Sequence, residues 1–412
     1  MEDKPLNKRI LALLGIVMSV LMLFGACAVK ETEETATASA SPEATENPVV
    51  AEVNGESIYY DEYYTLYASA CAQYGVSEDD ETNGGYIRSM IIDSLVNEKI
   101  MTQKLTENGY MDLTDEQLAE AEEKAQTDLD SYIDYYYGSE IKSSLGEDYT
   151  EEQYQEAKTP YQDQVLTGMG YTKDDFIGAY KLQIAEDAAK KALVGDILPT
   201  DEEVQAKYDE EVAADKESMD ADPKQYESTV SSGATAYYVP EGVRTVRQVL
   251  IKIDDDTSGA ISVLREQGYD DQAALLLEKA LADIKGEADD VLSKLKSGNI
   301  TFDEAITTYN DDPGMPETGY AVVEGSTTYV ESFTTGAMGL QTIGEFTDLV
   351  SSDYGYHIIE YFSDMQAGAV SFESVKQGLY DSLLATMQGE AWQKIVDEWT
   401  ESSNVVKYEE NM

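Results

Sequence analysis

A break in composition between Ala221 and Pro240 divides the chain into two kinds of sequence and so limits the folds open to it. The break contains two prolines, Gly233 and several serines. Before it, apolar residues recur at helical spacing; after it, short runs of β-branched residues alternate with helical patterns. A chain of 412 residues is long enough for two or three domains. The sequence therefore predicts a helical region followed by a compact α/β unit.

The helical region opens with a predicted hairpin. Two short strands between Val49 and Ile58 are joined by Asn54-Gly55, which suits a type I′ turn because both residues tolerate positive φ. Amphipathic helices are predicted over 59–74 and 86–108. Capping signals open further helices at four threonines: Thr114, Thr150, Thr172 and Thr200. Packing of these helices against one another is favoured, and a cradle for unfolded chains, lined by clusters such as Tyr135-Tyr136-Tyr137, is the alternative.

The α/β unit is predicted to run in the order β-α-α-β-α-β. Its first strand is Val243–Ile253, which is rich in β-branched residues. An acidic loop and an added helix are expected over 254–286, and Thr301 to Glu304 forms a capping box. The remaining elements follow the same apolar and turn signals: helices at 287–295, 301–309 and 333–340, and strands at 319–323 and 353–362.

His357 is the only histidine in the chain, and it lies where the last predicted strand enters the core. The run His-Ile-Ile-Glu-Tyr-Phe that it opens is typical of a buried strand. Histidine is also the side chain that ordinarily titrates near neutral pH. On this stretch alone, a satisfied core histidine is favoured over a functional one. The motifs that lie upstream of it reverse that preference.

The charge of the chain excludes nucleic acid as a partner. The net charge is −54, from 82 acidic and 28 basic residues, so no surface could neutralise phosphates. The same charge argues against adhesion to an anionic membrane through the protein itself. No loop has calcium-ligand spacing, so the acidic residues are interpreted as a means of solubility and of spacing from an anionic surface. No metal and no cofactor are expected.

A secretory signal is predicted at the start of the chain. Basic residues precede an apolar run from Ile10 to Gly25, and small residues lie before Cys27. Leu23 to Cys27 resembles a bacterial lipobox, in which the cysteine is acylated and becomes the mature N-terminus; Phe24 stands where leucine is usual. An uncleaved anchor helix is the alternative. Both interpretations put the rest of the chain outside the cytoplasm.

Two features follow from the residues after the signal. Residues 28–48 contain no aromatic side chain and little apolar content, so they are predicted to form a disordered tether. Cys71, the other of the two cysteines, falls in an apolar helical pattern with Leu66 and Tyr74. A buried free thiol is predicted there in preference to a reactive nucleophile, because no His or Asn neighbours it in sequence.

Six short motifs follow the break in composition. They are Val-Arg-Gln-Val-Leu-Ile-Lys at 246–252, Leu-Lys-Ser-Gly-Asn-Ile-Thr-Phe-Asp-Glu-Ala at 295–305, Tyr-Asn-Asp-Asp-Pro-Gly at 309–314, Val-Glu-Ser-Phe at 330–333, Ile-Gly-Glu-Phe at 343–346 and Tyr-Gly-Tyr-His-Ile-Ile at 354–359. In their order and spacing they resemble the parvulin-type peptidyl-prolyl isomerase domain. Each motif is short, and the specificity of the signal comes from the whole set.

The resemblance implies a proline site with a polar floor. His357 matches the family's second histidine, Ser352 its hydroxyl residue and Asp312 its Cys/Asp position. Gln248 stands in place of the first histidine; its amide can bridge by hydrogen bonds but cannot titrate, so reduced or absent activity is expected more readily than with two histidines. Three residues are expected to form the socket for the proline ring. Phe333 matches an aromatic residue of the family's pocket, Tyr329 stands where Met is usual, and Met338 stands where Phe is usual. The acidic insert after 252 makes a phosphate-binding variant unexpected.

Two further stretches resemble the PrsA- and SurA-type extracytoplasmic foldases. One is the Asn-Gly opening followed by an acidic helix start; the other is a long helix over 371–399 and a strand over 404–408. The resemblance implies an α+β fold, in which N- and C-terminal segments form a mostly helical chaperone domain, with Trp392 and Trp399 in its core, around an inserted parvulin-like domain. The predicted domain limits are 1–27 for a lipoprotein signal peptide, 28–48 for the tether, 49–239 for the chaperone domain, 240–364 for the isomerase domain and 365–412 for the closing segment.

The sequence leaves more than one function open. The first is a foldase, anchored by a lipid on Cys27 to the outer face of the bacterial membrane, that isomerises X-Pro bonds in unfolded secreted polypeptides. The second is a holdase whose weak or inactive parvulin domain only grips such clients, and Gln248 favours this alternative. A third interpretation, a surface spacer or adhesin, requires the motif match to be chance.

Overall fold

The computed structural model describes residues 47–412 except 81, 147, 169 and 170. Cys27, the predicted signal segment and nearly all of the predicted tether lie outside these residues. The described chain forms two compact units, one with the residues up to Leu198 together with Leu384–Met412, and the other with Pro199–Leu383. Within the described ranges, no helix is both long enough and apolar enough to cross a membrane. The domain limits predicted from the sequence stay a prediction.

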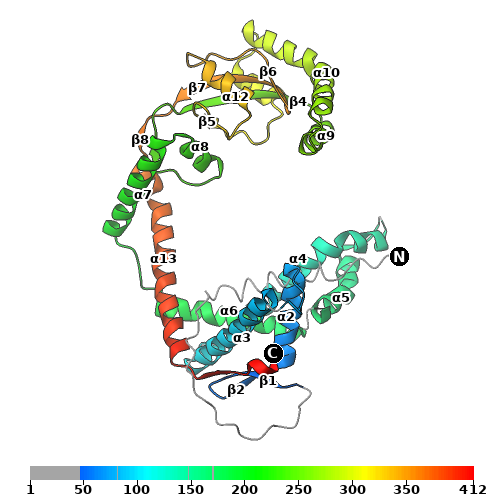
Figure 1. The fold of residues 1–412 in the computed structure, drawn as a ribbon, viewed down its shortest axis with the longest axis vertical. Coiled ribbons are helices and arrows are strands. Elements are labelled where there is room, and N and C mark those ends of the chain that lie inside the picture. Colours follow the sequence, from blue (N-terminus) through cyan, green and yellow to red (C-terminus); the bar gives the residue numbers. More distant parts are fainter. Residues whose placement is uncertain (1–46, 81, 147, 169–170) are drawn as a thin grey trace. The chain divides into compact units, whose positions relative to one another are not determined.

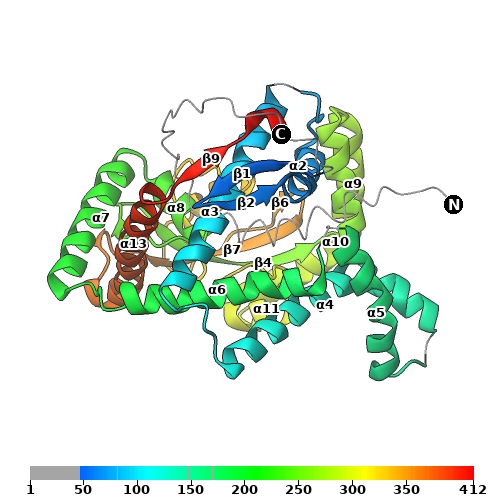
Figure 2. The same cartoon turned by 90° about the horizontal axis from the view of Figure 1, so that it is seen from below.

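A three-stranded antiparallel sheet joins the beginning and the end of the described chain. Its order is β2-β1-β9, with β1 at Val49–Val53, β2 at Glu56–Tyr59 and β9 at Val405–Lys407. Figure 2 shows the C-terminal strand (red) beside the two N-terminal strands (blue). Asn54 and Gly55 have φ angles of 51° and 87°, as a type I′ turn requires, so the predicted hairpin is confirmed. The short helix η1, Glu409–Asn411, follows β9.

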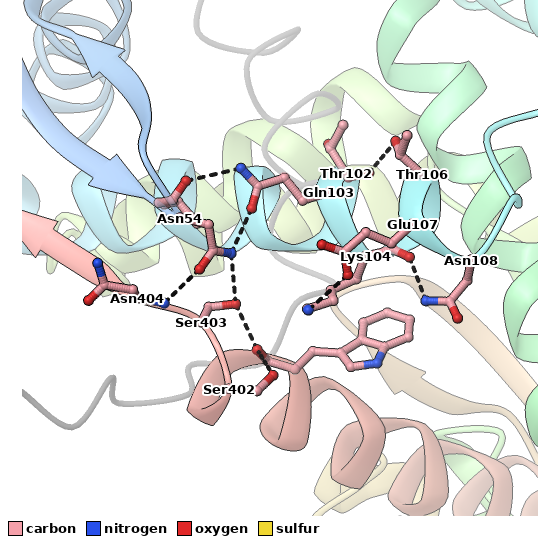
Figure 3. A network of polar contacts seen from close by, with 12 residues as sticks. Asn54, Thr102, Gln103, Lys104, Thr106, Glu107, Asn108, Ser402, Ser403 and Asn404 are labelled. Atoms are coloured by element: carbon pink, nitrogen blue, oxygen red, sulfur yellow. Dashed lines mark hydrogen bonds and ion pairs between the residues drawn. The ribbon is translucent and has the colours of Figure 1, made fainter.

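Asn54 ties this sheet together through its side chain (Figure 3). Its Oδ1 accepts from the Asn404 backbone N–H at 2.8 Å, and its Nδ2 donates to Gln103 Oε1 at 2.8 Å. The Gln103 amide in turn donates to the Val53 carbonyl at 3.0 Å. One turn residue therefore links the N-terminal hairpin, a helix and the C-terminal segment.

The helices of the first unit begin where the capping signals predict. Reciprocal hydrogen bonds between side chain and backbone form at Thr114, Thr150, Thr172 and Thr200, the last of which opens a helix of the second unit. Trp392 is buried and Trp399 packs beside it, as predicted. The helices are α2 at Tyr60–Tyr74, α3 at Asn83–Glu107, α4 at Asp115–Leu145, α5 at Glu151–Gly168, α6 at Lys173–Leu193 and the C-terminal part of α13 at Phe372–Glu401.

The second unit is built on a four-stranded antiparallel sheet in the order β5-β4-β7-β6 (Figure 1). Its strands are β4 at Arg244–Lys252, β5 at Tyr320–Val322, β6 at Val350–Ser352 and β7 at Gly355–Asp364. Its helices are α9 at Asp255–Glu266, α10 at Asp270–Lys296, α11 at Phe302–Tyr309 and α12 at Glu331–Gly339. The predicted α+β class is confirmed by this combination of helices and small antiparallel sheets.

Two local predictions for this unit are wrong. A helix boundary was expected at Gly286, but α10 continues through it, because a single glycine inside a helix costs only about 1 kcal/mol. An acidic loop and one added helix were expected over 254–286, but the stretch holds α9 and the first part of α10. The break at 221–240 also contains a helix and a short strand, which were not predicted. These are α8 at Lys224–Ser231 and β3 at Tyr238–Val239, which lie after α7 at Asp201–Ala221; β3 pairs with β8 at Gly368–Ala369.

The two faces of the sheet carry different residues because side chains alternate along a strand. Val249, Ile251 and Ile358 face α10 and α11 in one apolar cluster. Val246 and Ile359 lie in a second cluster that contains residues of α12. The second face therefore also carries Gln248 and His357, which keep the same alternation on β4 and β7.

Candidate functional site

A cavity of about 350 Å³ opens on the second face of the sheet. Its walls come from β4, the loop after α11, β5, the segment before α12, α12 itself and β7. A cavity of this size suits a small ring with part of an extended chain. Six side chains carry the chemistry of its lining: Gln248, Asp312, Tyr320, Tyr329, Phe333 and His357.

Four of the predicted polar residues form one continuous hydrogen-bonded chain. Ser352 Oγ lies 2.6 Å from His357 Nε2, and His357 Nδ1 lies 2.6 Å from Gln248 Oε1. Gln248 Nε2 then donates to Asp312 Oδ2 at 2.6 Å. Gln248 and His357 are diagonal neighbours, because Gln248 pairs with Ile359 and Leu250 with His357. The sheet register therefore brings together residues more than 100 positions apart in sequence.

The direction of this chain follows from Gln248. A carboxylate only accepts, so the Gln248 NH₂ group faces Asp312 and its carbonyl oxygen faces His357. The imidazole must then carry its proton on Nδ1, which leaves Nε2 to accept from the Ser352 hydroxyl. Ser352 Oγ also accepts from the Tyr354 backbone N–H at 3.1 Å. Each donor and acceptor in this chain is thereby matched to the opposite kind of group.

His357 is held in its neutral form. Its side chain is 4% exposed, and burial lowers its pKa to about 4 from the ordinary 6.5, against an opposing effect of Asp312. The neutral form is the one that both donates and accepts in this chain. The ring therefore contributes fixed dipoles to the cavity at neutral pH, and no charge.

The loop after α11 places Asp312. The Asn310 side chain accepts from the Leu250 N–H at 2.9 Å, and the Asp311 carboxylate accepts from the Lys252 N–H at 3.1 Å. The backbone N–H of Gly314 donates to Asp312 Oδ1 at 2.9 Å. Four residues of the loop are thus bonded to the edge of β4 or to each other, and the Asp312 carboxylate points at the amide of Gln248.

Aromatic rings form the apolar wall of the cavity. The Phe333 ring meets the His357 ring edge to face at 5.6 Å between centroids, and it lies 5.4 Å from Tyr329. Tyr320 lies 5.3 Å from Tyr329. Met338 packs against this cluster but is not among the residues that line the cavity. The structure thus places Phe333 and Tyr329 at the wall and Met338 behind it.

Tyr320 is the residue of the site that sequence reasoning missed. Its hydroxyl donates to Asp312 Oδ2 at 2.8 Å, on the same oxygen that receives Gln248. Burial, together with this hydrogen bond, raises its phenol pKa well above the ordinary value. A strand was predicted over 319–323, and its pairing with β4 sets Tyr320 opposite Val246. That pairing, once recognised, would have placed Tyr320 beside the site.

Family models match two separate parts of the chain. The SurA-like N-terminal domain matches residues 6–130, and the PPIC-type PPIase domain matches residues 272–363. The chain thus combines a SurA-like domain with a parvulin domain. The resemblance inferred from the motifs is confirmed. The match to the parvulin domain begins within α10, so it covers Asp312, Ser352 and His357 but leaves out β4 and Gln248.

Curated relatives extend this similarity over nearly the whole chain. Foldase protein PrsA of Clostridium botulinum strain 657 is 24% identical over 415 residues, which cover 98% of each chain. Foldase protein PrsA of Clostridium perfringens strain ATCC 13124 is 22% identical over 416 residues, 97% of this chain and 95% of that one. The crystal structure of PrsA from Bacillus subtilis aligns with 17% identity and a TM-score of 0.23, covering 86% of this chain and 92% of that chain. The relatives matched over nearly their full length and the PPIC-type match make the chain PrsA-like, with a parvulin domain of the PPIC type.

Proposed function

We propose that this chain is an extracytoplasmic foldase that isomerises X-Pro bonds in unfolded secreted polypeptides through the cavity of its parvulin domain. The observation that carries the proposal is the unbroken chain Ser352–His357–Gln248–Asp312 at the floor of an aromatic-walled cavity. The PrsA-like sequence and the PPIC-type domain match support the same function.

The reaction needs positioning and electrostatics, and no covalent step. Rotation about a peptide bond has a barrier of about 18–20 kcal/mol, because the amide is planar and partly double-bonded. An X-Pro bond therefore relaxes in tens to hundreds of seconds. An enzyme that favours the twisted amide over the planar one speeds this rotation. No bond is made or broken, so no nucleophile or group carrier is required.

The residues of the cavity meet this requirement in two ways. Phe333 and Tyr329 would take the proline ring and exclude the water that stabilises a planar, polar amide. Gln248, Asp312 and His357 present fixed dipoles and charge to the twisted amide, whose nitrogen has regained its lone pair because conjugation with the carbonyl is lost. Ser352 acts behind His357, where it holds the ring and its tautomer.

Gln248 supports a second candidate function. It stands where the parvulin pattern has a histidine, and an amide cannot shift a proton as an imidazole can. A weak or inactive isomerase that only binds extended clients, a holdase, is therefore the alternative. The intact hydrogen bonds on both sides of Gln248 favour a reduced isomerase over an inactive one.

The proposed location is the outer face of the bacterial membrane, with a lipid on Cys27 as the anchor. The lipobox-like stretch before Cys27 and the PrsA-like sequence support it. A tether over 28–48 would let the folded units reach clients as they emerge. Metabolic labelling with a fatty-acid probe tests this anchor: Cys27→Ser should remove the label and release the chain.

One experiment separates the two functions. The rate of cis/trans isomerisation of a proline peptide is measured with the wild type, Phe333→Ala and His357→Ala, and suppression of aggregation of an unfolded client is measured in parallel. The proposal expects catalysis by the wild type and loss of about tenfold or more in each variant. If all three are equally inert but the wild type still suppresses aggregation, the holdase function stands and the isomerase function fails.

A further inference from the structure

Glu227 is a buried carboxylate that lies outside the β-α-α-β-α-β unit. It belongs to α8, and its exposed fraction is 0%. Burial raises the pKa of this carboxyl, since a charged group loses its hydration there. Carboxylates are almost never fully buried unless a partner compensates them. The contacts of Glu227 therefore need an explanation.

A short chain of hydrogen bonds leads from Glu227 to the proline cavity. Its Oε2 accepts from the Ser326 hydroxyl. Ser326 Oγ accepts in turn from the Thr328 backbone N–H at 3.1 Å. Thr328 and the next residue, Tyr329, both line the cavity. Two hydrogen bonds thus connect α8 to the segment that carries the aromatic wall.

The helix that carries Glu227 is itself fixed. Tyr226 lies in an apolar cluster with Met219, Val243 and Val323, so it packs α8 against the segment that follows β5. The Tyr226 hydroxyl also donates to the Met365 sulfur at 3.5 Å. Because α8 is anchored at the start of the loop 323–329, Glu227 can hold the middle of that loop in one place.

The second oxygen of Glu227, Oε1, is buried as well. It makes no hydrogen bond to any described residue, although the Thr328 hydroxyl and the Val323 N–H lie near enough to favour the charged form. An apolar side chain of similar volume would avoid the cost of burying this oxygen. It could not, however, accept from Ser326 and so direct the loop.

We propose that Glu227 is a positioning residue for the proline socket, which fixes the loop 323–329 so that Tyr329 lies against Phe333 and sets the affinity for the client's proline segment. The proposal rests on the proposed function of the cavity and adds a residue outside the parvulin fold to it. Glu227 touches neither the polar chain nor the space where the peptide would lie. Its effect therefore falls on binding more than on the rate of rotation in the bound state, because the polar chain keeps its own contacts.

The test separates binding from rotation. KM and kcat for a fluorescent Ala-Ala-Pro-Phe peptide, and its Kd by fluorescence polarisation, are measured with the full-length chain. Glu227→Gln and Ser326→Ala should each raise KM and Kd about fivefold to tenfold, with kcat within about twofold, since the first removes the charged acceptor and the second removes the hydroxyl of the Glu227–Ser326 hydrogen bond. The double variant should bind the peptide no more weakly than either single variant, because both substitutions break the same chain of hydrogen bonds.

Two matched controls should behave as the wild type. Glu217→Gln removes an equal charge from an exposed position of α7, and Thr327→Ala removes a hydroxyl from an exposed position of the same loop. Ser326→Ala keeps the test open if Glu227→Gln fails to fold, and Tm is followed for all variants.

The proposal is overturned if Tm falls while KM and Kd stay unchanged, or if the effects of Glu227→Gln and Ser326→Ala on Kd add in the double variant. If the wild type binds the peptide without isomerising it, the isomerase function fails while the Kd series still decides on Glu227. If the wild type neither binds nor isomerises the peptide, both proposals fail.

Discussion

Gln248 gives the hydrogen-bonded chain of the cavity a fixed direction, because its amide has one donor group and one acceptor group. With two histidines in such a chain, each ring could move its proton from one nitrogen to the other. Here the amide assigns the Nδ1 proton to His357 and the accepting role to its Nε2. The floor of the cavity is therefore a set of fixed dipoles, with no alternative proton arrangement at neutral pH.

The pH dependence of catalysis follows from His357. Its pKa in the folded chain is about 4, below the ordinary 6.5, so the neutral ring persists well below neutral pH. Protonation of Nε2 would remove the acceptor of the Ser352 hydroxyl. We expect kcat to be constant from about pH 8 to pH 5.5 and to be lost towards pH 4. A pH–rate profile checks this, and a midpoint near pH 6.5 would contradict it.

The same shift contributes to stability with a defined sign. A group whose pKa is lower in the folded chain makes its full contribution above the unfolded value, here 6.5, and loses it as the pH falls towards 4. The loss amounts to about 3 kcal/mol. Urea unfolding of the wild type and of His357→Gln isolates this effect from the many carboxylates, because only the difference between the two depends on His357.

At the scale of elements, the turn between β6 and β7 decides where His357 lies. Gly355 has a φ of 144°, and a Cβ there would lie 2.1 Å from the Ile251 carbonyl oxygen on β4. Only glycine fits this close approach of two strands. The turn sets the register in which the next residues of β7 pair with β4, and so the position of His357 two residues later.

Gly355→Ala should therefore disturb both stability and the site. We expect a loss of about 2 kcal/mol or more in the free energy of unfolding, since the strand pair must separate, and a lower kcat. Gly268→Ala is the control: it has a φ of 76° but no atom within 4 Å of its Cβ, so it should cost only about 1 kcal/mol and leave kcat unchanged. Equal effects of the two substitutions on kcat would refute this account.

Particular elements show what the sequence could predict. The capping boxes and the Asn54-Gly55 turn were recognised because their chemistry acts over a few residues. Helix α8 was missed because Ser and Gly dominate its surroundings, although Asp222-Pro223 is a signal for the start of a helix. What holds α8 in place is the burial of Tyr226 and Glu227 against residues about a hundred positions away.

The residues of the site also fall into those that a local motif predicts and those that only tertiary packing places. The motifs predicted Gln248, Asp312, Ser352 and His357, and the structure brings all four into one chain. Tyr320 was missed because its contact with Asp312 depends on the pairing of β5 with β4, which no local pattern specifies. The contact between Glu227 and Ser326 was missed because it joins α8 to the isomerase unit only through tertiary packing.

At the scale of the whole molecule, the chain leaves its first unit and returns to it. Strand β9 pairs with β1, and Asn54 bonds to Asn404 across 350 positions of sequence. The polar chain and the aromatic wall, in contrast, lie wholly within Pro199–Leu383. Stability of the first unit and chemistry of the second therefore rest on different residues.

Removal of 404–412 tests this separation. We expect the first unit to lose protection against amide hydrogen exchange, because β1 would lose a neighbouring strand and Asn54 its partner. The isomerisation rate of the same variant should stay within about twofold of the wild type. Asn54→Ala should have the same effect to a smaller degree. A parallel loss of protection in β4 and β7 would show that the two units do not fold separately.

The central claim is that the hydrogen-bonded chain through Gln248 acts on the proline peptide bond, and NMR exchange spectroscopy of a proline peptide tests it most directly. Gln248→Leu keeps the size of the side chain but cuts the chain, and Gln272→Leu makes the same change at an exposed position of α10. We predict that Gln248→Leu lowers the exchange rate of the bound peptide about tenfold or more with little change in Kd, that Gln272→Leu leaves it unchanged, and that Gln248→His raises it. An exchange rate that Gln248→Leu leaves equal to that of the wild type would contradict the claim.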